Sequence, residues 1–462
     1  MERRRRSSSP YARRFLSPLI ALVLVAGTAP CALAAFGHIT LVGHLTLPGS
    51  PRVTNVWGYY DTKTHKEYAL VGDDKGGFFI VNVTDPSLPV LVTKVTGVPG
   101  RDIKPFGHYA YSCDGTGTGY ASSIVDISNP ALPVVLPHKF HSSHTLTISP
   151  HGNLFAEYVG VTIYDLVNDP TAPDSLYKIL NFGHDCTWRH NVLYDFNWNT
   201  LNIWNVANPA APVLLGSNDD PTIQSYHSGD ESKDGHYLYV CDELAVTPSP
   251  DMVVFNITNP ASPQRVGSII DTTSRVHQCY VVGNLMFVGY YTAGFKVFNI
   301  TNPAAPVLAD AYDTSPYQDD SGSDAYLGAW NAYPFAPSGI VYVSDHPGGL
   351  YLFSVEGFTG TITAAGDLPT ETFTLSQNYP NPFNPSTSIT FQMNRRAHAR
   401  LFIYDVNGAR VRTLVDGELP AGAHSVAWNG TDARGQTVAS GVYYYRLDAG
   451  GQSATKQMVL LK

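Results

Sequence analysis

The chain has 462 residues, of which 44% are hydrophobic, 12% aromatic and 15% charged, with 40 Gly and 33 Pro. This apolar content excludes a wholly disordered chain, and the many turn formers and aromatic residues favour sheet over helix. A formal net charge of −9 disfavours nucleic acid or an anionic membrane as a general partner, because counterion release would oppose binding. We therefore predict an all-β protein, long enough for two or three domains or for a repeat array with an appendage.

Residues 1–34 are predicted to form a signal peptide. A segment with six arginines precedes an apolar run from Phe15 to Ala26, and Ala32-Leu33-Ala34 supplies a small-residue cleavage site. A transmembrane anchor is the alternative, which the short run and Pro18 disfavour. Cleavage would remove six Arg and one Glu and leave a more acidic chain without a transmembrane segment. We expect an extracellular or outer cell-surface location.

Residues 36–356 carry an internal repeat. Each unit has an apolar strand, an Asx-Pro dipeptide that starts a turn, and a second proline that precedes the next strand. Successive Asx-Pro prolines are separated by 44, 40, 39, 51 and 43 residues, a period that matches one propeller blade of four strands. These prolines are Pro86, Pro130, Pro170, Pro209, Pro260 and Pro303.

The ends of this segment predict how the ring closes. The last unit has strands near Ala329–Tyr333, 340–344 and 350–353 but no outer strand, whereas residues 39–47 look like an outer strand without a unit. Pairing them would protect both edges. We predict a seven-bladed β-propeller, with six blades as the alternative because the copy around Asp165 is degraded.

The repeats resemble the LVIVD repeats of bacterial surface propellers. More specifically, the propeller region, roughly residues 36–356, resembles choice-of-anchor B proteins in several short segments. They are Arg101-Asp102-Ile103-Lys104, Gly183-His184-Asp185, Tyr226-His227-Ser228, Val276-His277-Gln278 and Gly328-Ala329-Trp330-Asn331 through Ser344-Asp345. The resemblance implies a propeller fold and implies no established activity.

Beyond a Gly- and Thr-rich linker predicted at 357–370, residues 371–462 show alternating strands that predict a small Ig-like β-sandwich. This stretch resembles the type A sorting domain of the type IX secretion system. The resemblance implies recognition by that machinery after Sec export, passage across the outer membrane and removal during surface attachment. A plain Ig-like accessory module is the alternative. The opening motif comprises Asn378, Pro380, Asn381, Pro382, Phe383, Asn384 and Pro385.

Aligned by their innermost strands, the units place polar or aromatic residues at one matching position beside the central channel, where propellers usually bind ligands. The aligned residues are Trp57, Asp102, His144, His184, His227, His277 and Trp330. We expect ligand binding by six of them together with Asp185, which adjoins the ring. These seven are Asp102, His144, His184, Asp185, His227, His277 and Trp330.

Four of the aligned residues are histidines, which together with nearby carboxylates suit a divalent metal such as Zn²⁺ or Ca²⁺. The predicted metal ligands are His144, His184, His227 and His277. Loops that reach the same face contribute Asp73, Asp74, Asp114, Asp242, Glu243, Asp345 and His346, with Arg101 and Arg275 close to the ring. Two alternatives remain, general acid–base catalysis and a purely structural hydrogen-bonded ring.

No catalytic signature of a known kind is present, so we assign no catalytic residue. The sequence favours an exported protein that binds or scaffolds an extracellular ligand or protein. A metal-dependent hydrolase or lyase acting on extracellular polymer is the second possibility. Four widely spaced cysteines are expected to be buried thiols without disulfides, namely Cys113, Cys186, Cys241 and Cys279.

Overall fold

The computed structural model describes residues 37–462 except for short gaps. The gaps are 50, 116–121, 142, 159, 181–182, 246–248, 272–273, 316–325, 359–372, 394–396, 407–408, 421, 450–451 and 462. The predicted signal peptide and most of the predicted linker lie outside the described residues. Among the residues that the structure describes, none forms a helix, and so none forms one long and apolar enough to cross a membrane.

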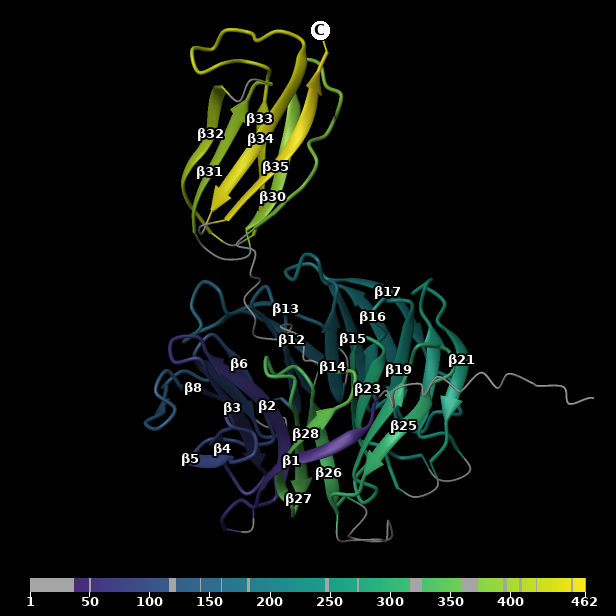
Figure 1. Cartoon of the computed structure of the whole chain (residues 1–462). Helices are drawn as coiled ribbons and strands as arrows, with labels where there is room; N and C mark the ends of the chain where they lie inside the picture. The colour runs from purple at the N-terminus through teal and green to yellow at the C-terminus, as the bar shows by residue number, and fades with distance from the viewer. Residues whose placement is uncertain are drawn as a thin grey trace, which may run out of the picture. The chain divides into compact units, whose positions relative to one another are not determined.

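Seven four-stranded antiparallel sheets occupy the segment from Ile39 to Val355 (Figure 1). Six of them, blades 1 to 6, each use four consecutive strands from β2 to β25. These strands are β2 Val53–Asp61, β3 Lys66–Asp73, β4 Phe78–Asn82, β5 Val90–Val95, β6 Asp102–Phe106, β7 Tyr109–Cys113, β8 Ser123–Asp126, β9 Val134–Val135, β10 Thr145–Ile148, β11 Asn153–Tyr158, β12 Gly160–Asp165, β13 Asp174–Lys178, β14 Asp185–Arg189, β15 Val192–Asn197, β16 Thr200–Asn205, β17 Val213–Asn218, β18 Ser228–Glu231, β19 Tyr237–Cys241, β20 Met252–Asn256, β21 Gln264–Ile269, β22 Gln278–Val282, β23 Leu285–Gly289, β24 Phe295–Asn299 and β25 Val307–Tyr312.

Blade 7 joins the two ends of the propeller. Its inner strands are β26 (Gly328–Tyr333), β27 (Val341–His346) and β28 (Gly349–Val355), and β1 (Ile39–Leu45) forms its outer strand. β1 runs antiparallel to β28, with Ile39 opposite Val355. The predicted closure is therefore confirmed, and so is the count of seven, because the degraded copy at β12 still builds a complete sheet.

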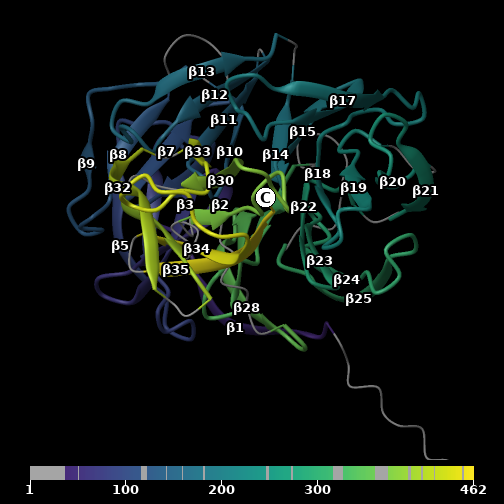
Figure 2. The ribbon, with the colours of Figure 1, turned by 90° about the horizontal axis from the view of Figure 1, so that it is seen from above.

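The blades are arranged in a ring around a central axis (Figure 2). Each innermost strand contacts the innermost strand of the next blade, in the order β2, β6, β10, β14, β18, β22, β26 and back to β2. These strands do not hydrogen-bond to one another as a sheet. Their inward-facing backbone groups therefore need other partners, which side chains in the channel supply.

The Asx-Pro turns form as the repeat predicts. In blade 5 the carbonyl of Asn259 accepts from the backbone N–H of Ser262 at 3.0 Å, and its side-chain oxygen accepts from the N–H of Ala261 at 3.3 Å. The same pair of bonds recurs at Asn129 and Asn208. The asparagine thus caps the turn while the following proline presets its backbone.

Glycines on three outer strands allow the turn of the next blade to approach. A Cβ on Gly43 would lie 2.0 Å from the Pro86 carbonyl oxygen, and one on Gly216 would lie 2.0 Å from that of Pro260. Gly267 meets the Ala304 carbonyl in the same way, at 2.4 Å. The outer strand of each of these blades is therefore packed against the turn of its neighbour.

Gly43→Ala is expected to destabilise the junction that closes the ring. The added methyl group would overlap a backbone carbonyl, which cannot rotate away, so we expect a loss of about 1–3 kcal/mol in the free energy of unfolding. Thermal and urea denaturation of the full chain would measure it. Gly417→Ala is the matched control, because no atom of the described part of the chain lies within 4 Å of its Cβ position. Equal stability of the two variants would contradict the expectation.

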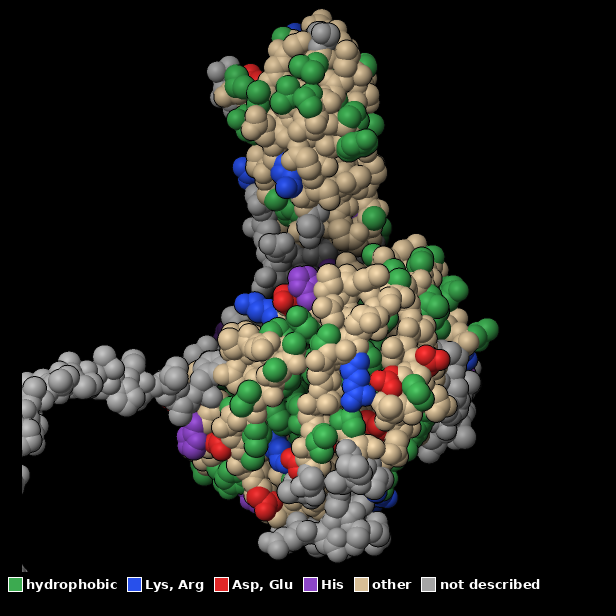
Figure 3. Space-filling model, turned by 90° about the vertical axis from the view of Figure 1, so that its right-hand side faces the viewer, with side chains coloured by type: hydrophobic (Ala, Val, Ile, Leu, Met, Phe, Trp, Pro, Cys, Tyr) green, Lys and Arg blue, Asp and Glu red, His purple; other side chains and the backbone are tan. Residues whose placement is uncertain are grey.

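Apolar side chains on the outer strands remain exposed, among them Val213, Val266 and Val307. Figure 3 shows apolar side chains scattered over one side of the propeller, with polar and charged groups between them. Single exposed apolar residues of this kind are ordinary on protein surfaces. These scattered apolar side chains therefore identify no binding face on the outer strands.

The C-terminal domain is a two-sheet sandwich with its own core around the buried Trp428. One sheet has the order β29-β30-β33 and the other the order β32-β31-β34-β35. The strands are β29 Phe373–Leu375, β30 Thr387–Met393, β31 Ala397–Tyr404, β32 Arg410–Leu419, β33 Gly422–Trp428, β34 Gly441–Ala449 and β35 Gln452–Leu460. The predicted Ig-like sandwich is confirmed.

The opening motif of the sandwich is anchored by three of its side chains. The buried Asn378 donates to Thr387, Phe383 packs on Trp428 with ring centroids 5.6 Å apart, and Asn381 accepts from the backbone of Val459. Its remaining members are exposed: Pro380, Pro382, Asn384 and Pro385. The motif therefore ties the start of the domain to its last strand and leaves a polar, proline-rich surface.

Candidate functional site

Four histidines occupy equivalent positions, each one residue before an innermost strand. The backbone N–H of His184 donates to the Phe196 carbonyl on the second strand of its blade at 2.8 Å. His144, His227 and His277 make the same bond in blades 3, 5 and 6. The alignment that predicted these histidines is thus correct for four consecutive blades.

The four imidazoles pack as a continuous row that ends on Trp330. Ring centroids are 4.0 Å apart for His144 and His184, 4.3 Å for His184 and His227, and 4.8 Å for His227 and His277. His277 then contacts Trp330 at 4.4 Å. We call these five residues, together with Arg101, the mouth ring.

Blades 1 and 2 depart from the predicted alignment. In blade 2 the equivalent position belongs to Arg101, whose N–H donates to Cys113 and whose guanidinium lies 5.1 Å from the Trp330 ring centroid. Asp102 is the first residue of β6 and lies one step deeper. In blade 1 a bulge between Val53 and Val56 shifts the register, so Trp57 also lies deeper. The placement of Asp102 and Trp57 level with the histidines was wrong.

Three of the histidines share one tautomer. Nδ1 lies 3.4 Å from the next blade's backbone carbonyl in His184, 2.9 Å in His227 and 2.7 Å in His277. A carbonyl only accepts hydrogen bonds, so Nδ1 must carry the proton and donate. Each bond links one blade to the next, and Nε2 is left as the nitrogen with the lone pair.

Burial keeps these rings uncharged. Desolvation lowers the pKa of His184 and of His227 to about 3. It also lowers the pKa values of His144 and His277 well below the usual range, and the neighbouring imidazoles add to both shifts. Neutral imidazoles are metal ligands and hydrogen-bond acceptors at neutral pH.

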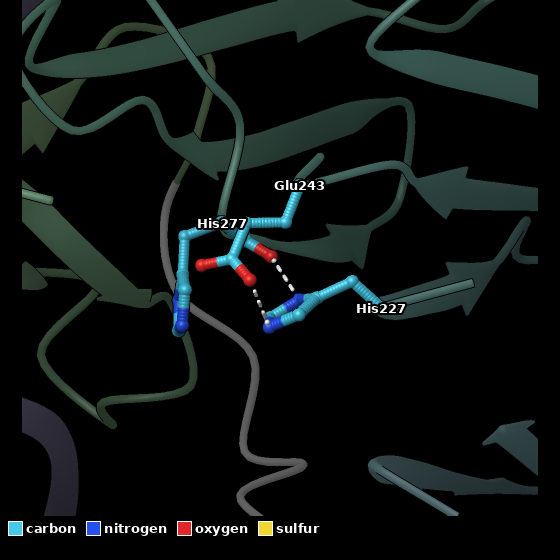
Figure 4. A group of neighbouring side chains, drawn as sticks. All are labelled: His227, Glu243 and His277. Carbon is cyan, nitrogen blue, oxygen red and sulfur yellow. Dashed lines mark hydrogen bonds and ion pairs between the residues drawn. The ribbon is translucent and has the colours of Figure 1, made fainter. Parts of the chain in front are cut away.

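Glu243, on the loop after β19, is the carboxylate that reaches the histidines. Its Oε2 lies 3.3 Å from Nε2 of His227 (Figure 4). Tyr291 donates its hydroxyl hydrogen to Oε1. Desolvation by burial raises the pKa of Glu243. His227, Glu243 and His277 each offer a donor atom, and these three atoms lie within 4.8 Å of one another.

Other predicted loop carboxylates hold the loops themselves. Asp242 accepts from the backbone of Gln224 and Ser225, and Asp345 accepts from Thr314. Asp73 accepts from Lys94 at 2.7 Å, whereas Asp74 lies 3.8 Å from Arg101. Of these four, only Asp74 is in contact with the mouth ring.

Trp198 and Tyr291 border the site and were missed in the sequence. Both lie in the tight turn after the second strand of a blade, with positive φ values of 53° and 28°. The indole of Trp198 meets His184 edge-on at 4.6 Å, and the ring of Tyr291 meets His277 at 5.3 Å. Left-handed backbone is unusual for aromatic residues and is often found at functional sites. An aromatic residue in such a short turn was the available signal.

The two predicted aspartates form a second level inside the channel. Asp102 accepts from Asn55, Lys104 and the backbone N–H of Leu146, and so connects blades 1, 2 and 3. Asp185 lies 3.4 Å from the side-chain amide of Gln278, and burial raises its pKa to about 7. These contacts give both aspartates a structural role between blades.

The four cysteines of the propeller, Cys113, Cys186, Cys241 and Cys279, are buried and form no disulfide, as expected from their spacing. Desolvation raises the pKa of Cys113 and of Cys186. Buried, protonated thiols of this kind are inert, so they add nothing to the site.

Comparisons with known proteins agree with the two domain types. The model of the LVIVD repeat matches residues 63–97, 100–136 and 275–314, and that of the FlgD Ig-like domain matches residues 377–453. The chain therefore contains LVIVD repeats and an FlgD Ig-like domain. None of the curated proteins matches the chain.

The chain is also similar to a solved structure of PorZ, described as an essential bacterial surface component of the type-IX secretion system of Porphyromonas gingivalis. Sequence identity is 13% and the TM-score 0.46, over 90% of this chain. This chain spans 60% of the length of the PorZ chain.

Proposed function

We propose that this chain is an exported, cell-surface binding protein whose propeller takes up an anionic extracellular ligand at the mouth ring. The observation that carries the proposal is the convergence of three buried imidazoles, the half-buried imidazole of His144, an arginine and a tryptophan at one end of the channel. The repeat alone requires none of these side chains.

The chemistry of the mouth ring supports a ligand that carries a carboxylate or a similar anion. Arg101 supplies a permanent positive charge over the face of Trp330. The Nε2 lone pairs of His184, His227 and His277 only accept, so they would bind hydroxyl groups of the same ligand rather than its anionic group. The ring of Trp330, which packs on His277, adds a flat aromatic group beside them. In this proposal Asp102 and Asp185 support the site from the level below.

The two ends of the chain support export. The signal-peptide pattern of residues 1–34 fits Sec export, and the sandwich from 371 carries the marks of a type A sorting domain. We propose that the type IX secretion machinery recognises this sandwich and delivers the propeller to the cell surface. The propeller segments fit the choice-of-anchor B pattern, a surface class without an assigned ligand.

Deletion of residues 371–462 is expected to abolish surface display. The native strain would carry the full chain or the deletion, and the accessibility of the propeller to an added protease would be measured on intact cells. We expect the full chain to be cleaved and the truncated chain to remain protected inside the cell. Equal accessibility of both chains would contradict a sorting role for the sandwich.

Ligand binding at the mouth is tested by calorimetry with citrate, succinate and acidic oligosaccharides as probes. Binding of at least one probe is expected, and Arg101→Gln should weaken it by about tenfold through loss of one charge-assisted hydrogen bond. Arg400→Gln, on the exposed face of the sandwich strand β31, is the matched control. No binding of any probe would remove support for an anionic ligand.

A further inference from the structure

We propose that a divalent transition-metal ion binds between two histidines of the mouth ring, His227 and His277, and the neighbouring Glu243. The inference rests on the proposed binding role of the mouth, and it adds the component that would hold an anionic ligand. The three side chains come from blades 5 and 6 and point toward one another (Figure 4).

The hydrogen bonds of the two histidines select the metal-facing nitrogen. Nδ1 of His227 donates to the carbonyl of His277 at 2.9 Å, and Nδ1 of His277 donates to that of Trp330 at 2.7 Å. Metal-ligating histidines in proteins typically commit their second ring nitrogen in this way, which fixes the ring and strengthens the ligand. Nε2 of both rings is therefore the available donor.

The carboxylate is held in a similar manner. Tyr291 donates to Oε1 of Glu243, which turns Oε2 toward Nε2 of His227. The lone pair of that nitrogen and the carboxylate oxygen are both acceptors, 3.3 Å apart. A cation between the two would satisfy both groups.

The spacing of one ligand pair also fits a tetrahedral ion. Bonds of about 2.0–2.1 Å to nitrogen and oxygen place neighbouring ligands about 3.3 Å apart. The separation of His227 Nε2 from Glu243 Oε2 is 3.3 Å. One potential ligand atom from each of the three side chains lies within 4.8 Å of the other two.

The donor set distinguishes between the two metals expected from the sequence. Two imidazole nitrogens and one carboxylate suit Zn²⁺ and related transition metals, whereas Ca²⁺ requires six to eight oxygen ligands. Three protein ligands leave a fourth position open. The carboxylate of an anionic ligand would occupy that position, next to Arg101.

The test uses the full chain without a histidine tag, stripped with a chelator and then supplied with Zn²⁺ or Co²⁺. We expect one equivalent of metal per chain after gel filtration, and a Co²⁺ visible spectrum typical of four-coordination. Ca²⁺ should not compete. Bound metal should also raise the melting temperature by mass action.

The variants His277→Ala and Glu243→Gln should each weaken Zn²⁺ binding by at least about tenfold. The matched control is His190→Ala. His190 is an exposed histidine of blade 4 that pairs with Glu231 of blade 5. Its metal binding should be unchanged. Circular dichroism would confirm that each variant is folded.

Substoichiometric metal in the wild-type chain would overturn the proposal without any variant. So would Zn²⁺ binding that is insensitive to both His277→Ala and Glu243→Gln. If the protein shows neither bound metal nor a Co²⁺ spectrum but still binds an acidic probe, the metal site is refuted and the proposed function stands. Surface display with no metal would likewise refute only the metal site.

Discussion

Asp102→Ala is expected to lower the free energy of unfolding by about 3–5 kcal/mol, because it leaves a buried charge without its partner. The side chains of Asp102 and Lys104 are each 4% exposed, and the Asp102 carboxylate lies 2.6 Å from Nζ of Lys104. The same carboxylate accepts from Asn55 in blade 1 and from the backbone of Leu146 in blade 3. Its loss therefore affects three blades at once.

A double variant separates the charge from the hydrogen bonds. Asp102→Ala combined with Lys104→Met should recover part of the loss, because no ammonium group then remains buried. Urea denaturation of the wild type, both single variants and the double variant would measure the coupling. Additive losses would show that the ion pair contributes nothing beyond its separate bonds. Zn²⁺ binding should persist in every folded variant.

Glu157→Gln is expected to stabilise the protein at alkaline pH by about 2 kcal/mol. Glu157 is fully buried on β11, and neither oxygen of its carboxyl has a hydrogen-bond partner among the residues that the structure describes. Desolvation raises its pKa well above the usual range, and Asp195 and Asp185 add to the shift. Gln fills the same space against Gly183 without acquiring a charge.

The sign of the pH dependence follows from the raised pKa. The folded chain holds the Glu157 proton more tightly than the unfolded chain, so this contribution to stability is complete below the unfolded pKa of about 4.3. It is lost as pH rises through the folded pKa. The stability difference between Glu157→Gln and wild type should therefore grow from pH 5 to pH 8.

Guanidinium denaturation at both pH values would test this expectation. Glu356→Gln, which changes an exposed carboxyl on the same propeller, is the matched control and should show no such growth. A constant difference for Glu157→Gln would mean that the carboxyl finds a partner in solution. A larger difference at pH 5 than at pH 8 would contradict the direction of the shift.

The blades could be predicted because their signals are local. The Asx-Pro turn depends on one residue: the side chain of Asn259 accepts from the backbone N–H two residues on, and its backbone carbonyl accepts from the N–H three residues on. Closure by Ile39–Leu45 followed from counting strands, since a sheet edge without a partner is unfavourable. The four histidines could be aligned because they precede strands of nearly uniform length.

The details of the mouth depended on contacts between distant residues. A bulge in β2 moved Trp57 away from the level of the histidines, and the start of β6 placed Arg101 there instead of Asp102. A bulge changes register by one residue without a clear composition signal. No count of residues along the chain could therefore decide which side chains share a level.

Tertiary contacts also decide which carboxylate reaches the histidines. Asp242 and Glu243 are adjacent in sequence, yet Asp242 holds its own loop while Glu243 reaches His227 and Tyr291. The backbone carbonyls that determine the histidine tautomers belong to the next blade, 43 to 53 residues away in sequence. Repetition in the sequence was sufficient to predict the ring and its histidines. Which nitrogen of an imidazole keeps its lone pair depends on how neighbouring blades pack, because the carbonyl that binds the other nitrogen lies outside that repeat.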